Sequence, residues 1–150
     1  MVKTKKMEAH TYNVNLTWKE DRLGEISSPE LNSTIEVATP PQFPKGIEGI
    51  WSPEHLFTAA VNSCFMTTFL SIAENSKLEF THFSCDGEGK LEQIEGKYLM
   101  TEVLLEPVLV IAKEADKEKA ERILQKSETA CLISNSIKSK VSVTTTIQFQ

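Results

Sequence analysis

The chain has 150 residues, enough for one domain with a substantial hydrophobic core. Acidic residues (21) outnumber Lys and Arg (16), for a formal net charge of −5, and no basic patch interleaved with aromatics is visible, which argues against nucleic-acid binding. Three cysteines without a Cys-x-x-Cys pair favour a cytoplasmic protein that uses thiols over a secreted disulfide scaffold.

The first half of the chain predicts three strands and a loop. Apolar and polar residues alternate over Thr11–Trp18, which predicts a half-buried strand, and Lys19–Asp21 is expected to be a polar turn. Further strands are predicted over Arg22–Ser28 and Thr34–Thr39. Pro40–Gly49 contains three prolines and two glycines, so we interpret it as a loop leading to the next element.

The most distinctive segment is Ser52–Asn75, which we predict to be a long helix. Ser52 can cap its first N–H groups, and the proline that follows suits the first helical position. No charged residue occurs over positions 56–73, and apolar side chains cover most of the circumference, so we expect burial on nearly all sides. The length approaches that of a membrane span. Asn62 and several Ser and Thr favour a core helix instead, and with no apolar leader at the N-terminus we expect no membrane partner.

The second half alternates strands with helices. Strands are predicted over Glu79–Cys85 and Lys90–Gln93, with Asp86–Gly89 between them as a turn or bulge. A long strand is predicted over Tyr98–Ile111, in which Pro107 suggests an edge position or a bulge.

Two helices and a strand are expected to complete the chain. Glu114–Glu128 has an apolar stripe opposite a charged face, Ser127–Ile137 indicates a break and a short new helix, and Val141–Phe149 is a Val/Thr/Ile strand. This order predicts an α+β fold in one domain over residues 1–150, with antiparallel sheets wrapped around the long helix.

The chemistry is expected to lie with the cysteines. The dinucleotide, phosphate-loop and zinc-protease motifs are absent, and the three histidines lack metal-ligand spacing, so we expect no cofactor and no metal. The nucleophile-elbow motif of hydrolases is also absent. Cys85 lies in a strand pattern and is interpreted as a small apolar core residue. Cys64, in the middle of the long helix, and Cys131, in the short helix, remain as candidates.

Two motifs resemble those of the OsmC/Ohr family of thiol peroxidases. One is Ser52–Phe57 (SPEHLF) with Cys64 twelve positions after its serine, and the other is Cys131–Ser136 (CLISNS). The order of strands and helices matches as well. The resemblance implies an intertwined homodimer with active sites at the interface. It also implies reduction of organic hydroperoxides to alcohols in oxidative stress defence, with an external dithiol, a lipoyl protein or a small thiol, as the reductant.

The resemblance also implies roles for four residues. Cys64 corresponds to the peroxidatic cysteine, which becomes a sulfenic acid, and Cys131 to the resolving cysteine, which closes a Cys64–Cys131 disulfide. Glu54 corresponds to the glutamate that orients a catalytic arginine, and Arg22 is the candidate for that arginine. The proline usual after the second cysteine is replaced by Leu132, which leaves the OsmC or Ohr subfamily open.

Elementary electrostatics predicts how Cys64 is activated. It lies about twelve residues into its helix, beyond the reach of the helix dipole, and burial raises the pKa of a thiol. We therefore expect a cation nearby. The chain has two arginines, and Arg122 lies in the charged run of a helix, so Arg22 is favoured. The alternative function is a non-catalytic relative that senses redox state or binds a small molecule.

Overall fold

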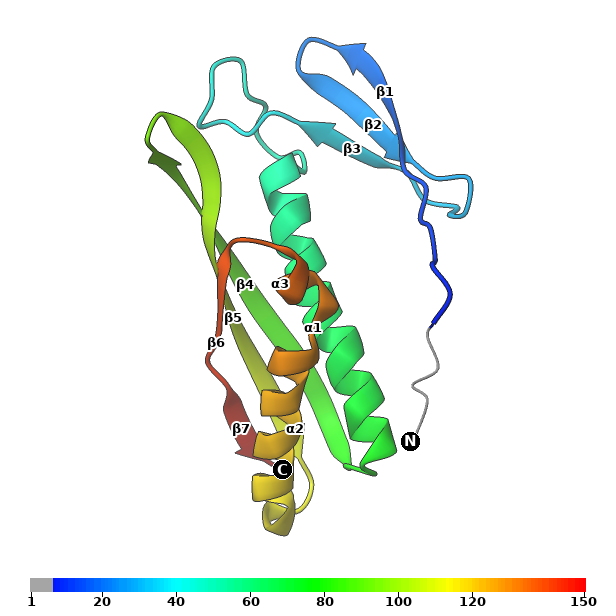
Figure 1. Ribbon diagram of the computed structural model, residues 1–150, viewed down its shortest axis with the longest axis vertical. Coiled ribbons are helices and arrows are strands. Elements are labelled where there is room, and N and C mark those ends of the chain that lie inside the picture. The colour runs from blue at the N-terminus through cyan, green and yellow to red at the C-terminus, as the bar shows by residue number, and fades with distance from the viewer. Residues whose placement is uncertain (1–6) are drawn as a thin grey trace, which may run out of the picture. The chain divides into compact units, whose positions relative to one another are not determined.

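The computed structural model describes residues 7–150, and its strands and helices confirm the α+β prediction (Figure 1). Contacts divide the chain into two compact units, one ending at Pro53 and the other running from Glu54 to Gln150. The prediction of a single domain over residues 1–150 stays a prediction.

The first unit contains an antiparallel sheet of three strands in the order β1-β2-β3. The strands are β1 (Asn15–Glu20), β2 (Leu23–Ser27) and β3 (Ile35–Ala38). The turn between β1 and β2 consists of Asp21 and Arg22, and Asp21 has a left-handed φ of 46°. The predicted turn at Lys19–Asp21 was therefore placed too early, and the strand predicted from Arg22 begins one residue later.

This N-terminal sheet has one polar and one apolar face. On the polar face, Lys19 pairs with Glu25 at 3.3 Å and with Glu36 at 3.4 Å. Leu16 and Trp18 of the opposite side are 67% and 73% exposed. The register of the three strands places the following residues on what we call the open face of the N-terminal sheet: Leu16, Trp18, Ile26, Ile35 and Val37.

The loop predicted over Pro40–Gly49 is confirmed. The N–H of Phe43 donates to the C=O of Pro40 at 3.1 Å, and a Cβ at position 46 would overlap the carbonyl oxygen of Pro40, so the tight path of this loop requires Gly46. The chain then adds Trp51 beside β3, where the N–H of Ala38 donates to the C=O of Trp51 at 2.8 Å.

The helix α1 (Pro53–Asn75), which apart from its first residue lies in the second unit, confirms the long helix predicted over Ser52–Asn75. A hairpin of two 15-residue strands follows, β4 (Phe80–Ile94) and β5 (Lys97–Ile111). Then come a 3₁₀ turn, η1 (Glu114–Asp116), and two helices, α2 (Lys117–Ala130) and α3 (Leu132–Ser136). The break and the short helix predicted over Ser127–Ile137 are confirmed.

The turn predicted at Asp86–Gly89 is wrong, because β4 runs straight through these residues and the hairpin turns at Glu95 and Gly96. The glycines have another purpose. A Cβ at position 87 would lie 3.1 Å from the side-chain nitrogen of Asn62, and one at position 89 would overlap the Thr58 hydroxyl. Glycine is thus needed here because α1 approaches the strand closely, and not because the chain turns.

The final strand predicted over Val141–Phe149 is divided into β6 (Lys140–Val143) and β7 (Thr146–Phe149). Both pair with β5 in parallel and in one register, so the sheet is mixed and not purely antiparallel.

Pro107 accounts for this division. In the register with β5, the gap between β6 and β7 at residues 144–145 lies opposite Pro107. The C=O groups of Leu105 and Ile111 point toward the side of β5 where β6 and β7 pair, and a backbone N–H at position 107 would point the same way. Proline has no such N–H to donate. The edge position or bulge predicted for Pro107 is wrong, because β5 pairs on both sides and its register with β4 does not shift there.

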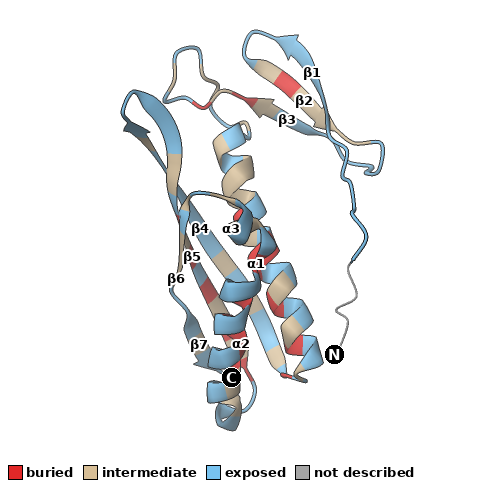
Figure 2. Cartoon of the chain, viewed as in Figure 1, coloured by how far each residue is buried: buried red, intermediate tan, exposed pale blue. Residues whose placement is uncertain are grey.

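The core of the second unit lies between the helices and one face of β5. It is formed by Val61, Phe65, Phe69, Ala73, Leu78, Val103, Leu105, Leu109, Ile111, Ala120, Ile123 and Leu124. Figure 2 shows that the buried residues of α1 form a stripe along the helix and that much of its remaining surface is exposed. Met66 and Leu70, for example, are 39% and 41% exposed. We predict burial of α1 on nearly all sides, but within this chain only one face of the helix is buried.

Candidate active site

Cys64 lies on the buried stripe of α1, and its side chain is 8% exposed. Its sulfur is 4.0 Å from the hydroxyl oxygen of Thr68, one turn further along the helix. The hydroxyl of Thr67 donates to the Cys64 carbonyl at 3.1 Å. The thiol therefore lies in the middle of a long helix, with its sulfur beside the Thr68 hydroxyl.

Cys131 lies at the break between α2 and α3, and it is 1% exposed. Its backbone is extended (φ −62°, ψ 109°), so the chain changes direction here and α3 starts anew at Leu132. The first N–H groups of a helix have no partner within that helix. At this break those groups, from Leu132 and Ile133, act with the Cys131 thiol as hydrogen-bond donors that lower the pKa of the Cys64 thiol. Both cysteines are free thiols.

These contacts decide the acidity of Cys64. Burial is the largest single influence and acts to raise the pKa of the Cys64 thiol, as we predict from the sequence. The opposing donors are the Ile133 N–H, the Cys131 thiol, the Thr68 hydroxyl and the Leu132 N–H, and together they leave the pKa of Cys64 below its usual value. Neutral hydrogen-bond donors therefore act to lower this pKa within the chain, and the cation that we expect near Cys64 stays a prediction.

Cys85 has the opposite environment. Burial raises the pKa of its thiol to about 11, and the nearby carboxylates of Asp86 and Glu106 act in the same direction. Its Sγ lies 3.8 Å from the carbonyl oxygen of Asp86, and its side chain packs against the core. This agrees with the interpretation of Cys85 as a small core residue.

We expect alkylation to separate the cysteines by pH. At pH 8, iodoacetamide should label Cys64 before Cys85, and labelling of Cys85 should rise only as the pH approaches 11, since the thiolate is the reacting form. Peptide mass spectrometry after timed quenching gives both rates. In urea the two rates should become equal. Equal rates in the folded protein at pH 8 would contradict the difference in acidity.

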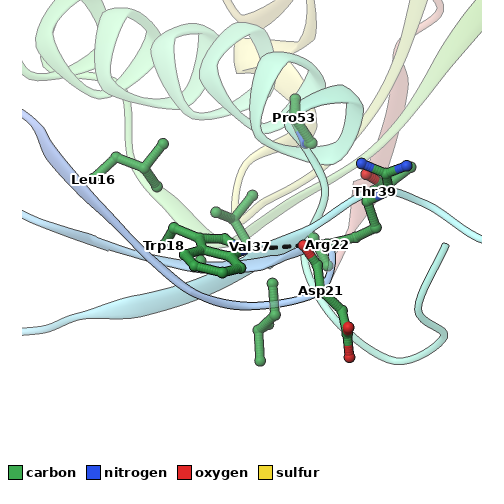
Figure 3. A pocket seen from close by; sticks show the side chains of 10 residues that line it. Leu16, Trp18, Asp21, Arg22, Val37, Thr39 and Pro53 are labelled. Atoms are coloured by element: carbon green, nitrogen blue, oxygen red, sulfur yellow. Dashed lines mark hydrogen bonds between the residues drawn. The ribbon is translucent and has the colours of Figure 1, made fainter. Parts of the chain in front are cut away.

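Arg22 lies in the β1–β2 turn, within the first unit. It lines a pocket of about 270 Å³ in that unit, together with the apolar side chains of Leu16, Trp18 and Val37 (Figure 3). The indole N–H of Trp18 donates to the C=O of Asp21 at 3.0 Å, which fixes the turn that carries the arginine.

Glu54 lies in the first turn of α1, in the second unit. Ten residues of straight helix separate it from Cys64 by roughly 15 Å. The second unit thus brings Cys64 and Cys131 together but not Glu54. The predicted roles of Arg22 and Glu54 stay predictions.

Three groups that lower the pKa of Cys64 were not predicted from the sequence: the Thr68 hydroxyl and the N–H groups of Leu132 and Ile133. Thr68 has a signal in the sequence, because residues four positions apart share one face of a helix. For the N–H groups of Leu132 and Ile133, the sequence contains only an indirect signal, which is the predicted break before the short helix. Across residues 7–150, no three His, Cys, Asp or Glu side chains gather in a way that could hold a metal ion.

An α+β fold with two reduced cysteines, in which the thiol of one acts with neighbouring donors to lower the pKa of the other, defines a protein with a paired-thiol site. The family model described as OsmC-like protein matches residues 45–146, so the chain belongs to the OsmC-like protein family. The OsmC/Ohr resemblance inferred from the two motifs is thereby confirmed.

Similar proteins agree with this assignment. The uncharacterized protein YmaD of Bacillus subtilis (strain 168) is 24% identical over 143 residues, which cover 90% of this chain and 91% of that one. An OsmC-like protein of unknown function from Vibrio cholerae has a TM-score of 0.82 at 24% identity, covering 91% of this chain and 99% of that one. An organic hydroperoxide resistance protein from Elizabethkingia anophelis has a TM-score of 0.75 at 22% identity, with 95% and 99% covered. At these identities the structures confirm the fold.

Proposed function

We propose that this protein is a thiol-dependent peroxidase that reduces organic hydroperoxides to alcohols and serves in oxidative stress defence in the cytoplasm. The observation that carries the proposal is the Cys64–Cys131 pair, in which the first thiol has a lowered pKa and the second thiol acts as one of the hydrogen-bond donors that lower it. Family membership supports it, and so does the fold shared with an organic hydroperoxide resistance protein.

The proposed cycle begins with the Cys64 thiolate, which attacks the terminal oxygen of the hydroperoxide. The O–O bond breaks, the alkoxide takes a proton and leaves as the alcohol, and Cys64 is left as a sulfenic acid. The Cys131 sulfur then attacks the Cys64 sulfur, water leaves, and a disulfide forms. The Cys131 thiol already acts as a hydrogen-bond donor to Cys64, which places the attacking sulfur near its target. An external dithiol, a lipoyl protein or a small thiol, reduces the disulfide by exchange, and no cofactor is required.

Arg22 and Glu54 complete the proposal. A guanidinium offers two parallel N–H donors to a carboxylate and keeps its charge at every physiological pH. In the proposed site, Glu54 orients Arg22, and the arginine holds the peroxide near Cys64. The neutral donors that lower the pKa of Cys64 leave the arginine free to act on the substrate instead of on the thiol.

We further propose a homodimer with its active sites at the interface. Each unit of the chain has an apolar surface of its own, the open face of the N-terminal sheet and the exposed side of α1, where Met66 and Leu70 lie. Exposed apolar surfaces are a common feature of protein–protein interfaces. By length and composition α1 would also suit a membrane. Its exposed Ser63, Thr67 and Ser71 favour a protein partner.

A peroxidase assay tests the proposed function. With a dithiol reductant in excess, we expect turnover of an alkyl hydroperoxide and slower turnover of hydrogen peroxide, because apolar side chains line the pocket beside Arg22. Consumption of one equivalent of peroxide without turnover, with or without dithiol, would favour the redox-sensing alternative. No reaction with either peroxide would refute the peroxidase.

A further inference from the structure

At the break between α2 and α3, a single residue forms hydrogen bonds to the chain on both sides of the break. The side-chain amide of Asn135 donates to the C=O of Thr129, in the last turn of α2, at 3.1 Å. The backbone N–H of the same residue donates to the C=O of Cys131 at 3.1 Å. One residue of α3 is therefore tied both to the end of the preceding helix and to the cysteine at the break.

The other side-chain bonds described at this junction stay within a single helix. The Ser136 hydroxyl donates to the C=O of Leu132, inside α3, and the Thr129 hydroxyl donates to the C=O of Gln125, inside α2. Neither of them fixes the angle between α2 and α3. That angle matters because it decides where the first two N–H groups of α3 point.

We propose that Asn135 is a positioning residue, which holds the N–H groups of Leu132 and Ile133 against the sulfur of Cys64 by tying α3 to the last turn of α2. The inference deepens the proposed peroxidase, since it rests on Cys64 as the reacting thiol. Asn135 does not touch Cys64 itself. It acts through the backbone of the break, because a five-residue helix makes too few bonds of its own to hold its direction.

The test is the pH dependence of Cys64 alkylation in wild type and in Asn135→Ala. Without the tie, α3 can turn away and the two N–H donors weaken, so we expect the midpoint to rise by about 0.5–1 pH unit, a roughly three- to tenfold loss of thiolate at a pH below both midpoints. Alanine favours helices more than asparagine does, so a general loosening of α3 is not expected. Circular dichroism and the melting temperature establish that the variant is folded.

Two further variants sharpen the result. Thr129→Ala removes a side chain from the same turn of α2 but keeps the C=O that Asn135 uses, so its midpoint should equal that of wild type. Asn135→Gln keeps the amide one methylene further out, and its midpoint should lie between those of wild type and Asn135→Ala. It also replaces the alanine variant if that variant is recovered unfolded. Hydrogen exchange of the Leu132 and Ile133 amides should be faster in Asn135→Ala.

Equal midpoints in folded wild type and in whichever Asn135 variant is folded would overturn the positioning role, as would an equal rise in Thr129→Ala. This outcome is distinct from a failure of the proposed function, because alkylation reports on the thiol without peroxide. A raised midpoint together with no peroxide turnover in wild type would leave the positioning role standing and refute the peroxidase.

Discussion

Replacing Cys64 by serine is expected to abolish peroxide turnover, with a loss on the order of 10³-fold or more, because the hydroxyl is not ionised near neutral pH and cannot replace the thiolate as nucleophile. Cys131→Ser should still consume one equivalent of peroxide and then stop, since the sulfenic acid at Cys64 has no partner thiol. A coupled dithiol-oxidation assay measures turnover, and intact-mass spectrometry measures the first oxidation.

Cys85→Ser is the matched control for these variants. The pKa of Cys85 is raised to about 11 and its side chain packs against the core, so its replacement should leave turnover unchanged. Non-reducing peptide mapping of peroxide-treated wild type should identify a bond between Cys64 and Cys131. A dominant disulfide that includes Cys85, or full turnover by Cys64→Ser, would refute the assigned roles.

A substitution on the exposed side of α1 is expected to have a large effect on dimer formation. In the proposed homodimer, Leu70→Glu would bury an unpaired carboxylate at the interface, a cost of about 3 kcal/mol or more, which corresponds to at least a hundredfold weaker association. Light scattering at micromolar concentration should therefore give a dimer for wild type and a monomer or an aggregate for this variant.

Leu31→Glu offers the corresponding control, because Leu31 is 67% exposed in the turn between β2 and β3 and lies outside both apolar surfaces. It makes the same chemical change and should remain dimeric. A monomeric wild type with full peroxidase activity would refute the dimer, and the apolar surfaces would then have to be covered within one chain.

Local patterns were sufficient for most of the fold. The uncharged run over positions 56–73, with a capping residue before it, predicts α1, because burial and capping act along a single helix. Tyr98–Ile111 matches β5 almost residue for residue. Gly87 and Gly89 show where local reasoning ends. A glycine allows a turn and also allows a helix to approach, and only the position of α1 decides between the two.

The candidate site was predictable to a similar depth. Cys64 and Cys131 stand in motifs, so the pair could be named from the sequence. The activation of Cys64 could not, because two of its donors are backbone N–H groups, which every residue except proline has, and their direction depends on how α2 and α3 meet. Side-chain charge was the only activator visible in the sequence, and so the reasoning turned to Arg22.

The parallel pairing of β5 with β6 determines when, during synthesis, the environment of the thiol pair can be completed. Parallel strands need a crossover, and here α2, Cys131 and α3 make up that crossover, so they are held in place only when β6 has paired with β5. Cys131 follows Cys64 by 67 residues. At ribosomal speeds of about 5–20 residues per second, Cys64 leaves the ribosome roughly 3–13 s before its partner. During that time Cys64 lacks the N–H donors of α3. If Cys131 is the resolving cysteine, as we propose, the pKa of the Cys64 thiol is lowered only once its proposed resolving partner has been synthesised.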